Sequence, residues 1–291
     1  MRAFALFVAY IAALLVGGAL LEYPVYRLAR LFDADIGYWT LSGRLTIPLG
    51  LITLYPFLRW MRLADAASLG YALRRGEFPK ALLVGWVLGV AMMLPLFGLL
   101  LGLGARVLDL APPAIPAALL TAAAGAFFSG LSVAFIEETF FRGALYTAVA
   151  RLRDPVAAIV LSSVLYALLH FVDSDHRVPA HAIGWETGLR VLLHSFGAFA
   201  TPQEILDSAL ALTAAGVFLG LVRLRDGHIA RCIGLHAGWV FAIKELKAVS
   251  HGVPEAPWGW LIGGYDKVTG WLALVWLLLI MAMILRSRRS I

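Results

Sequence analysis

The chain has 291 residues, of which 61% are hydrophobic and only 14% are charged. Because about a quarter of the residues are charged in soluble domains, this composition excludes a soluble globular protein. The composition predicts an all-α, polytopic integral membrane protein with a single membrane domain over residues 1–291. The net charge of +6 comes from basic residues in short loops, which indicates orientation in a membrane and no binding to nucleic acid, and the single cysteine excludes an intramolecular disulfide.

Apolar runs separated by short polar segments predict about eight transmembrane helices. These lie at about residues 3–21, 41–60, 81–104, 117–153, 155–172, 204–224, 229–249 and 268–285. The first run also has the length of a signal peptide, but further spans follow, so we expect a retained helix. Residues 59–80 predict a basic loop with a short interfacial helix, and residues 185–199 predict an amphipathic interfacial helix. The positive-inside rule then places both termini in the cytoplasm, and we expect a bacterial inner-membrane location.

Two adjacent carboxylates lie inside the long apolar run at residues 116–150. Glu137 and Glu138 are followed by Arg142 about one helical turn later. An ionisable residue at membrane depth costs about 2.5–3.5 kcal/mol on insertion scales, so these residues predict a functional site. Arg142 stands four residues after Glu138 and can pair with it on one helical face. We therefore expect a structural ion pair at Glu138 and a chemical role for Glu137.

Histidines in other apolar spans are the expected partners of these glutamates. The spans on either side of residues 152–155 form an antiparallel hairpin, in which Glu137 and His170 lie at the same depth, about 25 Å from the turn by helical rise. Tyr166 lies one turn before His170. His236, in the seventh span, lies only about 15 Å along its helix. A lone histidine in an apolar helix is more often a packing or hydrogen-bonding residue, and this alternative stays open for His236.

The pattern resembles the CPBP family of intramembrane endopeptidases, the CAAX-processing, bacteriocin-processing and abortive-infection group that includes the type II CAAX prenyl protease. The first motif of that family, two glutamates followed after three residues by an arginine, is similar to Glu137, Glu138 and Arg142. The resemblance covers about residues 117–249, where we expect the protease core.

The two later motifs of the family are matched less completely. Tyr166 and His170 resemble the second motif, an aromatic residue four before a histidine, with tyrosine in place of the usual phenylalanine. The third motif is a histidine four before an asparagine or aspartate. His236 is present, but Val240 occupies the later position. Valine has no side-chain donor or acceptor, so a backbone N–H or the indole of Trp239 would have to supply a donor there.

The resemblance implies an endopeptidase that hydrolyses a peptide bond in a membrane-associated or C-terminal peptide substrate, which is lipidated in one branch of the family. Peptide hydrolysis needs a base for water, a proton donor for the leaving amine and donors to the oxyanion. In this hypothesis Glu137 takes a proton from a water held together with His170. His236 stabilises the oxyanion or carries the proton. No cofactor is required, and membrane lipid and a peptide or protein substrate are the expected partners.

Three alternatives remain open from the sequence. Glu137, His170 and His236 could be ligands of a catalytic Zn²⁺, but the chain lacks a His-Glu-x-x-His helix, so a metal-free mechanism is preferred. Val240 favours a catalytically inactive membrane scaffold or immunity-type protein. A buried Glu–His pair is also compatible with a small proton-coupled transporter, although no repeat of interrupted helices is visible.

Overall fold

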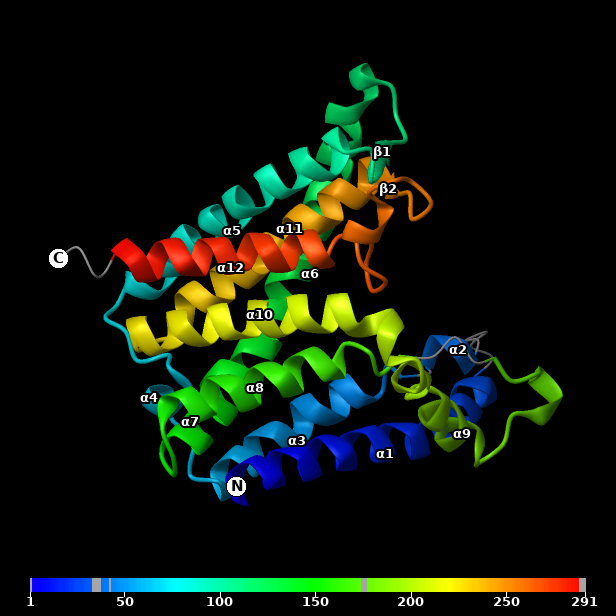
Figure 1. Cartoon of the computed structure of the whole chain (residues 1–291). Coiled ribbons are helices and arrows are strands. Elements are labelled where there is room, and N and C mark those ends of the chain that lie inside the picture. The colour runs from blue at the N-terminus through cyan, green and yellow to red at the C-terminus, as the bar shows by residue number, and fades with distance from the viewer. Residues whose placement is uncertain (1, 33–37, 42, 174–176, 288–291) are drawn as a thin grey trace. The chain divides into compact units, whose positions relative to one another are not determined.

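The structure is a computed structural model that describes all residues except 1, 33–37, 42, 174–176 and 288–291. The chain divides into two compact units, residues 1–64 with 168–203 and residues 65–167 with 204–291. Nearly all regular structure in both units is helical (Figure 1). The helical content agrees with the predicted all-α membrane protein, and the single domain stays a prediction.

The first unit is built around the long helix α1. Its elements are α1 (Arg2–Leu31), α2 (Tyr38–Leu41), α3 (Thr46–Trp60), η3 (Ala180–Ala182), α9 (Thr187–His194) and η4 (Gly197–Ala200). α1 approaches both α3 and α9 closely at glycines, since a Cβ on Gly18 would lie 2.4 Å from Thr46 Oγ1 and one on Gly188 would lie 2.0 Å from the Ala19 carbonyl oxygen. A helix, α9, is present within the predicted range 185–199 but is shorter than expected, and its interfacial position stays a prediction.

α1 also carries a buried carboxylate that the sequence analysis did not single out. Glu22 is 3% exposed. One of its oxygens accepts a hydrogen bond from the Tyr38 hydroxyl at 2.8 Å, and the other accepts one from the backbone N–H of Gly43, also at 2.8 Å. These two bonds satisfy the carboxylate locally and hold the chain after α1 against the helix.

The second unit contains most of the remaining helices. In chain order they are α4 (Ala66–Leu69), α5 (Glu77–Gly102), η1 (Pro112–Ala114), α6 (Ile115–Glu138), η2 (Thr139–Leu145), α7 (Tyr146–Ala150), α8 (Pro155–Leu169), α10 (Pro202–Asp226), α11 (Ala230–Val249), η5 (Gly259–Leu261) and α12 (Trp271–Ser287). α8 extends two residues beyond the unit at its end, and α10 begins two residues before it. Apolar side chains of α5, α10, α11 and α12 form its main core.

α5 and α11 pack with their backbones in close contact, side by side in Figure 1. A Cβ on Gly234 would lie 2.1 Å from the Leu82 carbonyl oxygen, and one on Gly238 would lie 2.5 Å from that of Trp86. On the facing helix, Gly85 and Gly89 approach α11 in the same way. Small residues spaced four apart allow such an approach in membranes. This contact holds the part of α11 that carries His236.

Two short strands depart from the expected all-helical fold. β1 (Arg106–Leu108) pairs antiparallel with β2 (Ser250–Gly252), with Arg106 opposite Gly252 and Leu108 opposite Ser250. The buried Arg106 guanidinium donates to the Ser250 hydroxyl at 3.1 Å and to the Lys267 carbonyl at 2.8 Å. Neither segment was predicted as a strand from the sequence.

Four helices are long and apolar enough to cross a membrane, namely α1, α5, the continuous run Ile115–Ala150 and α10, while α8 and α12 are shorter apolar helices. The chain is therefore an integral membrane protein. Several spans differ in extent from expectation: the segment predicted at 41–60 contains α3, with 15 residues, and α8 ends three residues before the predicted end at 172. The count of eight spans stays a prediction.

Candidate active site

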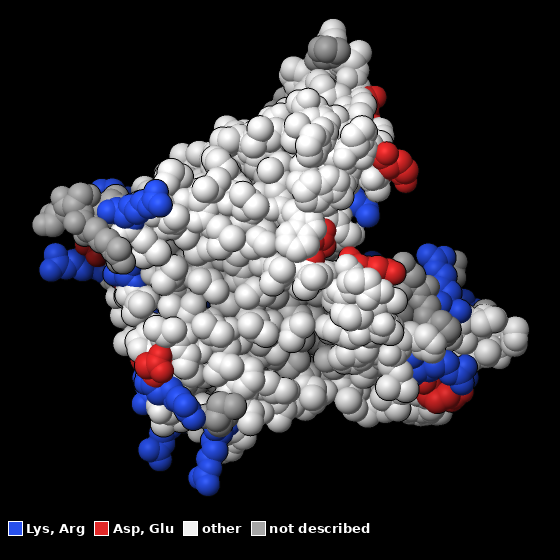
Figure 2. Space-filling model, in the orientation of Figure 1, with Lys and Arg blue, Asp and Glu red and all other residues white. Residues whose placement is uncertain are grey.

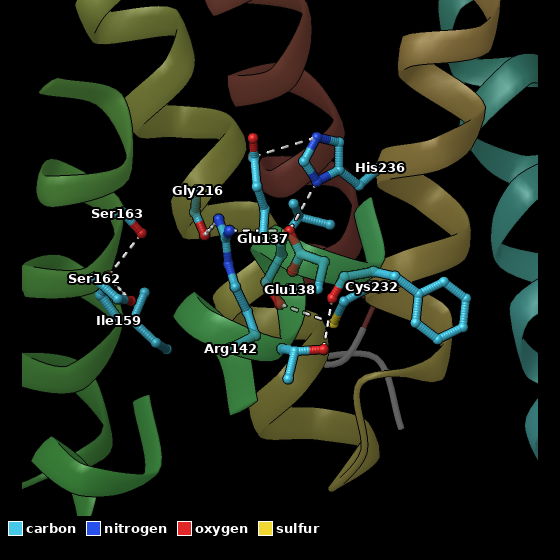
Figure 3. Close-up of polar contacts among 12 residues, drawn as sticks. Glu137, Glu138, Arg142, Ile159, Ser162, Ser163, Gly216, Cys232 and His236 are labelled. Atoms are coloured by element: carbon cyan, nitrogen blue, oxygen red, sulfur yellow. Dashed lines mark hydrogen bonds and ion pairs between the residues drawn. The ribbon is translucent and has the colours of Figure 1, made fainter. Parts of the chain in front are cut away.

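A buried ion pair lies at the end of α6. Arg142 Nη1 donates to Glu138 Oε1 at 3.0 Å, and both side chains are fully buried. The spacing of the two residues predicted this pair. Arg142 Nη2 donates in addition to the Gly216 carbonyl of α10 at 3.2 Å (Figure 3). The arginine thus joins the carboxylate of one helix to the backbone of another.

His236 of α11 reaches both glutamates. Its Nδ1 lies 2.9 Å from Glu138 Oε1, and its Nε2 lies 3.8 Å from Glu137 Oε2 (Figure 3). Glu138 Oε1 also accepts a bond from Arg142, and we assign His236 Nδ1–H as the donor of the second bond to this oxygen. The second ring nitrogen therefore faces Glu137. The contact at 3.8 Å is too long for a direct hydrogen bond.

The two glutamates differ in access to the surroundings. Glu138 is 0% exposed, whereas the Glu137 side chain is 28% exposed. Glu138 is bonded to Arg142 and His236, while Glu137 makes no direct hydrogen bond to any side chain that the structure describes. Glu138 is thus held in a closed polar cluster. Glu137 has the more accessible side chain, although its Oε2, which faces His236, is buried.

Aromatic rings enclose this cluster. The Arg142 guanidinium lies 4.6 Å from the Tyr166 ring centroid, within cation–π range. The Tyr166 ring stands edge-on to His236, with centroids 6.1 Å apart, and to Phe141, with centroids 5.4 Å apart. Tyr166 on α8 therefore fixes both the arginine and the imidazole. The sequence analysis placed Tyr166 near His170 but did not predict these contacts.

A π-helical segment, η2, shapes the end of α6. Thr139–Leu145 winds with the wider π spacing and continues directly into α7. Arg142 lies within it, and its carbonyl oxygen accepts a bond from Arg223 Nε at 3.1 Å. A Cβ on Gly143 would lie 2.9 Å from the Leu69 carbonyl oxygen, so α4 packs closely against the segment. Single π turns often occur at functional sites. The sequence analysis predicted an unbroken α-helix here.

The residues around the incomplete third motif lie beside the cluster on α11. Trp239 is buried against Phe218, with ring centroids 5.8 Å apart. Its indole Nε1 has no hydrogen-bond partner within the described part of the chain. A role for Trp239 as an oxyanion donor in place of a side chain at Val240 stays a prediction.

His170 is a predicted site residue that belongs to a different unit from the cluster. It follows the last residue of α8, Leu169, and belongs to the first unit, whereas Glu137 and His236 belong to the second. It is half-buried. Its expected proximity to Glu137 stays a prediction.

Glu137, His170 and His236 are the candidate ligands of a metal. A catalytic zinc takes three protein ligands. Glu137 Oε2 and His236 Nε2 face one another, but His236 Nδ1 is already engaged by Glu138. Outside the masked positions, no group of three His, Cys, Asp or Glu side chains could hold a metal ion. The preference for a metal-free mechanism stays a prediction.

Comparison with protein families matches residues 118–242 to the family described as Type II CAAX prenyl endopeptidase Rce1-like. The matched segment begins in α6 and ends in α11, so it contains the glutamates, Arg142, Tyr166 and His236. No curated protein matches the chain. No solved structure matches it. Residues 118–242 are therefore similar to the Rce1-like family of type II CAAX prenyl endopeptidases, a family of proteases, and this match supports the resemblance found in the sequence.

Proposed function

We propose that the protein is an intramembrane endopeptidase in which Glu137 is the general base that activates water. The observation that carries this assignment is the contrast between the glutamates: Glu138 is closed off by Arg142 and His236, while Glu137 is partly exposed and faces the second nitrogen of the same imidazole. A base must be within reach of the water from which it takes a proton. Glu137 meets this requirement and Glu138 does not.

The proposed reaction moves one proton from water to the leaving amine around one addition. Glu137 takes this proton from a water, whose oxygen attacks the carbonyl carbon of the scissile peptide. Glu137 then passes the proton to His236 Nε2, which delivers it to the leaving amine as the tetrahedral intermediate collapses and the C–N bond breaks, so Glu137 returns to its carboxylate form. Glu138 accepts the Nδ1–H of His236 and so orients the ring. Such a carboxylate partner also stabilises an imidazole that carries a second proton.

His170 and Trp239 complete the proposal. His170 would hold the attacking water with Glu137, as the family resemblance implies. The indole Nε1 of Trp239, which has no partner among the described residues, would donate to the oxyanion that forms on the substrate carbonyl. This donor would replace the side chain that Val240 lacks.

The proposed substrate is a peptide or protein held at the membrane, with a lipidated C-terminal peptide as the first class to test. The protein itself is proposed to lie in a bacterial inner membrane with both termini in the cytoplasm, because basic residues gather in the segments that then face inward. Lipid is the surrounding partner.

A cleavage assay with matched glutamine variants tests the assignment. The wild type, Glu137→Gln, Glu138→Gln and the exposed control Glu204→Gln are purified into lipid nanodiscs and given a library of peptides with free or farnesylated cysteine near the C-terminus. Mass spectrometry reports new termini. Glu137→Gln is expected to abolish cleavage, and Glu204→Gln to leave it unchanged. Full activity of Glu137→Gln would refute the proposed base.

A non-catalytic scaffold is the second candidate, since Val240 has no hydrogen-bonding side chain where the family has one. In a strain that lacks the protein, proteomics of membrane-proximal cleavages identifies the products that disappear. Complementation with Glu137→Gln then separates the two functions. A scaffold keeps its cellular role in this variant, whereas a protease loses it.

Metal dependence is tested on the same material. Elemental analysis of the purified protein is combined with cleavage assays before and after chelation. The metal-free mechanism predicts less than one zinc per ten molecules and unchanged cleavage after chelation. Stoichiometric zinc, together with activity that is lost on chelation and restored by Zn²⁺, would contradict it.

A further inference from the structure

A cavity of about 480 Å³ lies between α5, α10, α11 and α12, away from the glutamates. Its walls are apolar along most of their length, with Leu88 from α5, Leu221 from α10, Leu235 from α11 and Ile284 from α12. Leu235 lines it, whereas the next residue, His236, contacts Glu138. The cavity and the candidate active site therefore use different faces of α11. Its volume falls within the range of about 300–1,000 Å³ that is usual for ligand sites.

The polar end of this cavity is positively charged. Arg225, Asp226 and Arg231 line it where α10 ends and α11 begins. Arg286 follows the lining residue Leu285 at the end of α12. Against the positive charges of these three arginines, the acidic residue that lines the cavity is Asp226. In Figure 2, blue side chains gather on the side where α12 ends, next to a broad white surface.

The charges at this end are only partly neutralised within the protein. Asp226 pairs with Arg231, with 2.8 Å between Oδ2 and Nη1. The Nε of Arg231 is buried and lacks a hydrogen-bond partner among the described residues. Arg225 is exposed and has no ion pair in the part of the chain that the structure describes. The cavity thus combines apolar walls with hydrogen-bond donors and positive charge that are not fully paired within the described residues.

We propose that this cavity binds an anionic glycerophospholipid, with an acyl chain along α5 and α12 and the phosphate at Arg225 and Arg231. Basic pockets between transmembrane helices suit anionic headgroups. An arginine presents several N–H donors to phosphate oxygens. A bound lipid would connect α5, α10 and α12 to the helix that carries His236. This site is independent of the proposed proteolysis and does not require it.

Native mass spectrometry of the detergent-purified full chain tests the proposal, with phosphatidylglycerol or phosphatidylcholine titrated as the probe. The variants are Arg225→Gln, Leu221→Trp, which fills the channel, and Arg75→Gln, which removes an exposed arginine outside the cavity. Circular dichroism and gel filtration confirm that each variant is folded. The wild type is expected to retain phosphatidylglycerol in preference to phosphatidylcholine.

Arg225→Gln is expected to weaken phosphatidylglycerol binding by about fivefold, the effect of removing one arginine near a lipid headgroup. Arg75→Gln should change it by less than about twofold, since Arg75 is exposed, does not line the cavity and is screened by salt. A folded Leu221→Trp variant should lose both lipids. Equal retention of the two lipids by the wild type would overturn the proposal. Equal effects of Arg225→Gln and Arg75→Gln would also overturn it.

Discussion

Gly234 is the position where one added methyl group should have the largest effect on the site. In Gly234→Ala the new Cβ would lie 2.1 Å from the Leu82 carbonyl oxygen and 2.7 Å from the Trp86 backbone nitrogen. Carbon–oxygen contacts between packed helices are about 3.3–3.6 Å, so α5 and α11 must separate by about 1 Å. Both contacts are to backbone atoms, which cannot turn aside as a side chain can. His236 lies two residues further along α11 and must move with it.

Two magnitudes follow from this displacement. Overpacking of a tight contact costs about 1–3 kcal/mol of unfolding free energy. Misplacement of a catalytic group by about 1 Å lowers the rate by on the order of 10²-fold. We therefore expect Gly234→Ala to remain folded but less stable, and to lose cleavage through kcat more than through KM.

Gly98→Ala is the matched control, because it makes the same substitution in α5. Apart from the neighbouring residues and backbone of its own helix, no described atom lies within 4 Å of the Cβ position at Gly98. Alanine is favoured over glycine within a helix by about 1 kcal/mol, so this variant should be at least as stable as the wild type and equally active. Denaturant unfolding in mild detergent and initial cleavage rates measure both variants. If Gly234→Ala behaves like Gly98→Ala, the close contact of α5 with α11 does not position His236.

Three further predictions concern other parts of the chain. Arg142→Met is expected to cost about 3–5 kcal/mol of unfolding free energy, because it leaves the buried Glu138 carboxylate without its cation. The double variant Arg142→Met with Glu138→Gln should recover most of this loss in a denaturant unfolding assay. Additive losses in the double variant would contradict the stabilising ion pair. His170→Ala should lower kcat by about 10²-fold or more if His170 holds the attacking water, and wild-type cleavage rates would place it outside the site. The hydrogen bonds from the Ser68 hydroxyl and backbone N–H lower the pKa of Asp65. The contribution of the Asp65 carboxylate to the stability of α4 is therefore present above about pH 3.9 and is lost as the pH falls through the lowered pKa. Asp65→Asn should show a smaller change in thermal stability between pH 5 and pH 3 than the wild type, and identical profiles would contradict the assignment.

Contacts within one helix could be predicted from the sequence. Glu138 and Arg142 are four residues apart, so a helix of any fold brings them together, and the ion pair is present at 3.0 Å. Long apolar runs likewise predicted α1, α5 and α10, because crossing a bilayer requires that length in any arrangement. The position of the π segment could not be predicted from the sequence, since the local pattern of residues 139–145 is also compatible with an ordinary α-helix.

The contacts between helices were predicted only in part. Helical rise placed His236 shallower than the glutamates, whereas in the structure its ring reaches both of them. The sequence signal for this contact is the spacing of Gly85 with Gly89 and of Gly234 with Gly238, since small residues four apart predict close helix packing. The Gly216 carbonyl that accepts from Arg142 carries no such signal, because every residue has a carbonyl group.

The sequence by itself determined that the chain is a helical membrane protein with costly charges in an apolar segment, because composition and spacing along one helix do not depend on packing. Only the tertiary structure decided how those charges are used. It engages Glu138 with Arg142 and His236 and leaves Glu137 partly exposed. The physical reason is that a shared imidazole has two nitrogens in opposite directions, and packing of α11 against both α5 and α6 sets which glutamate each one faces.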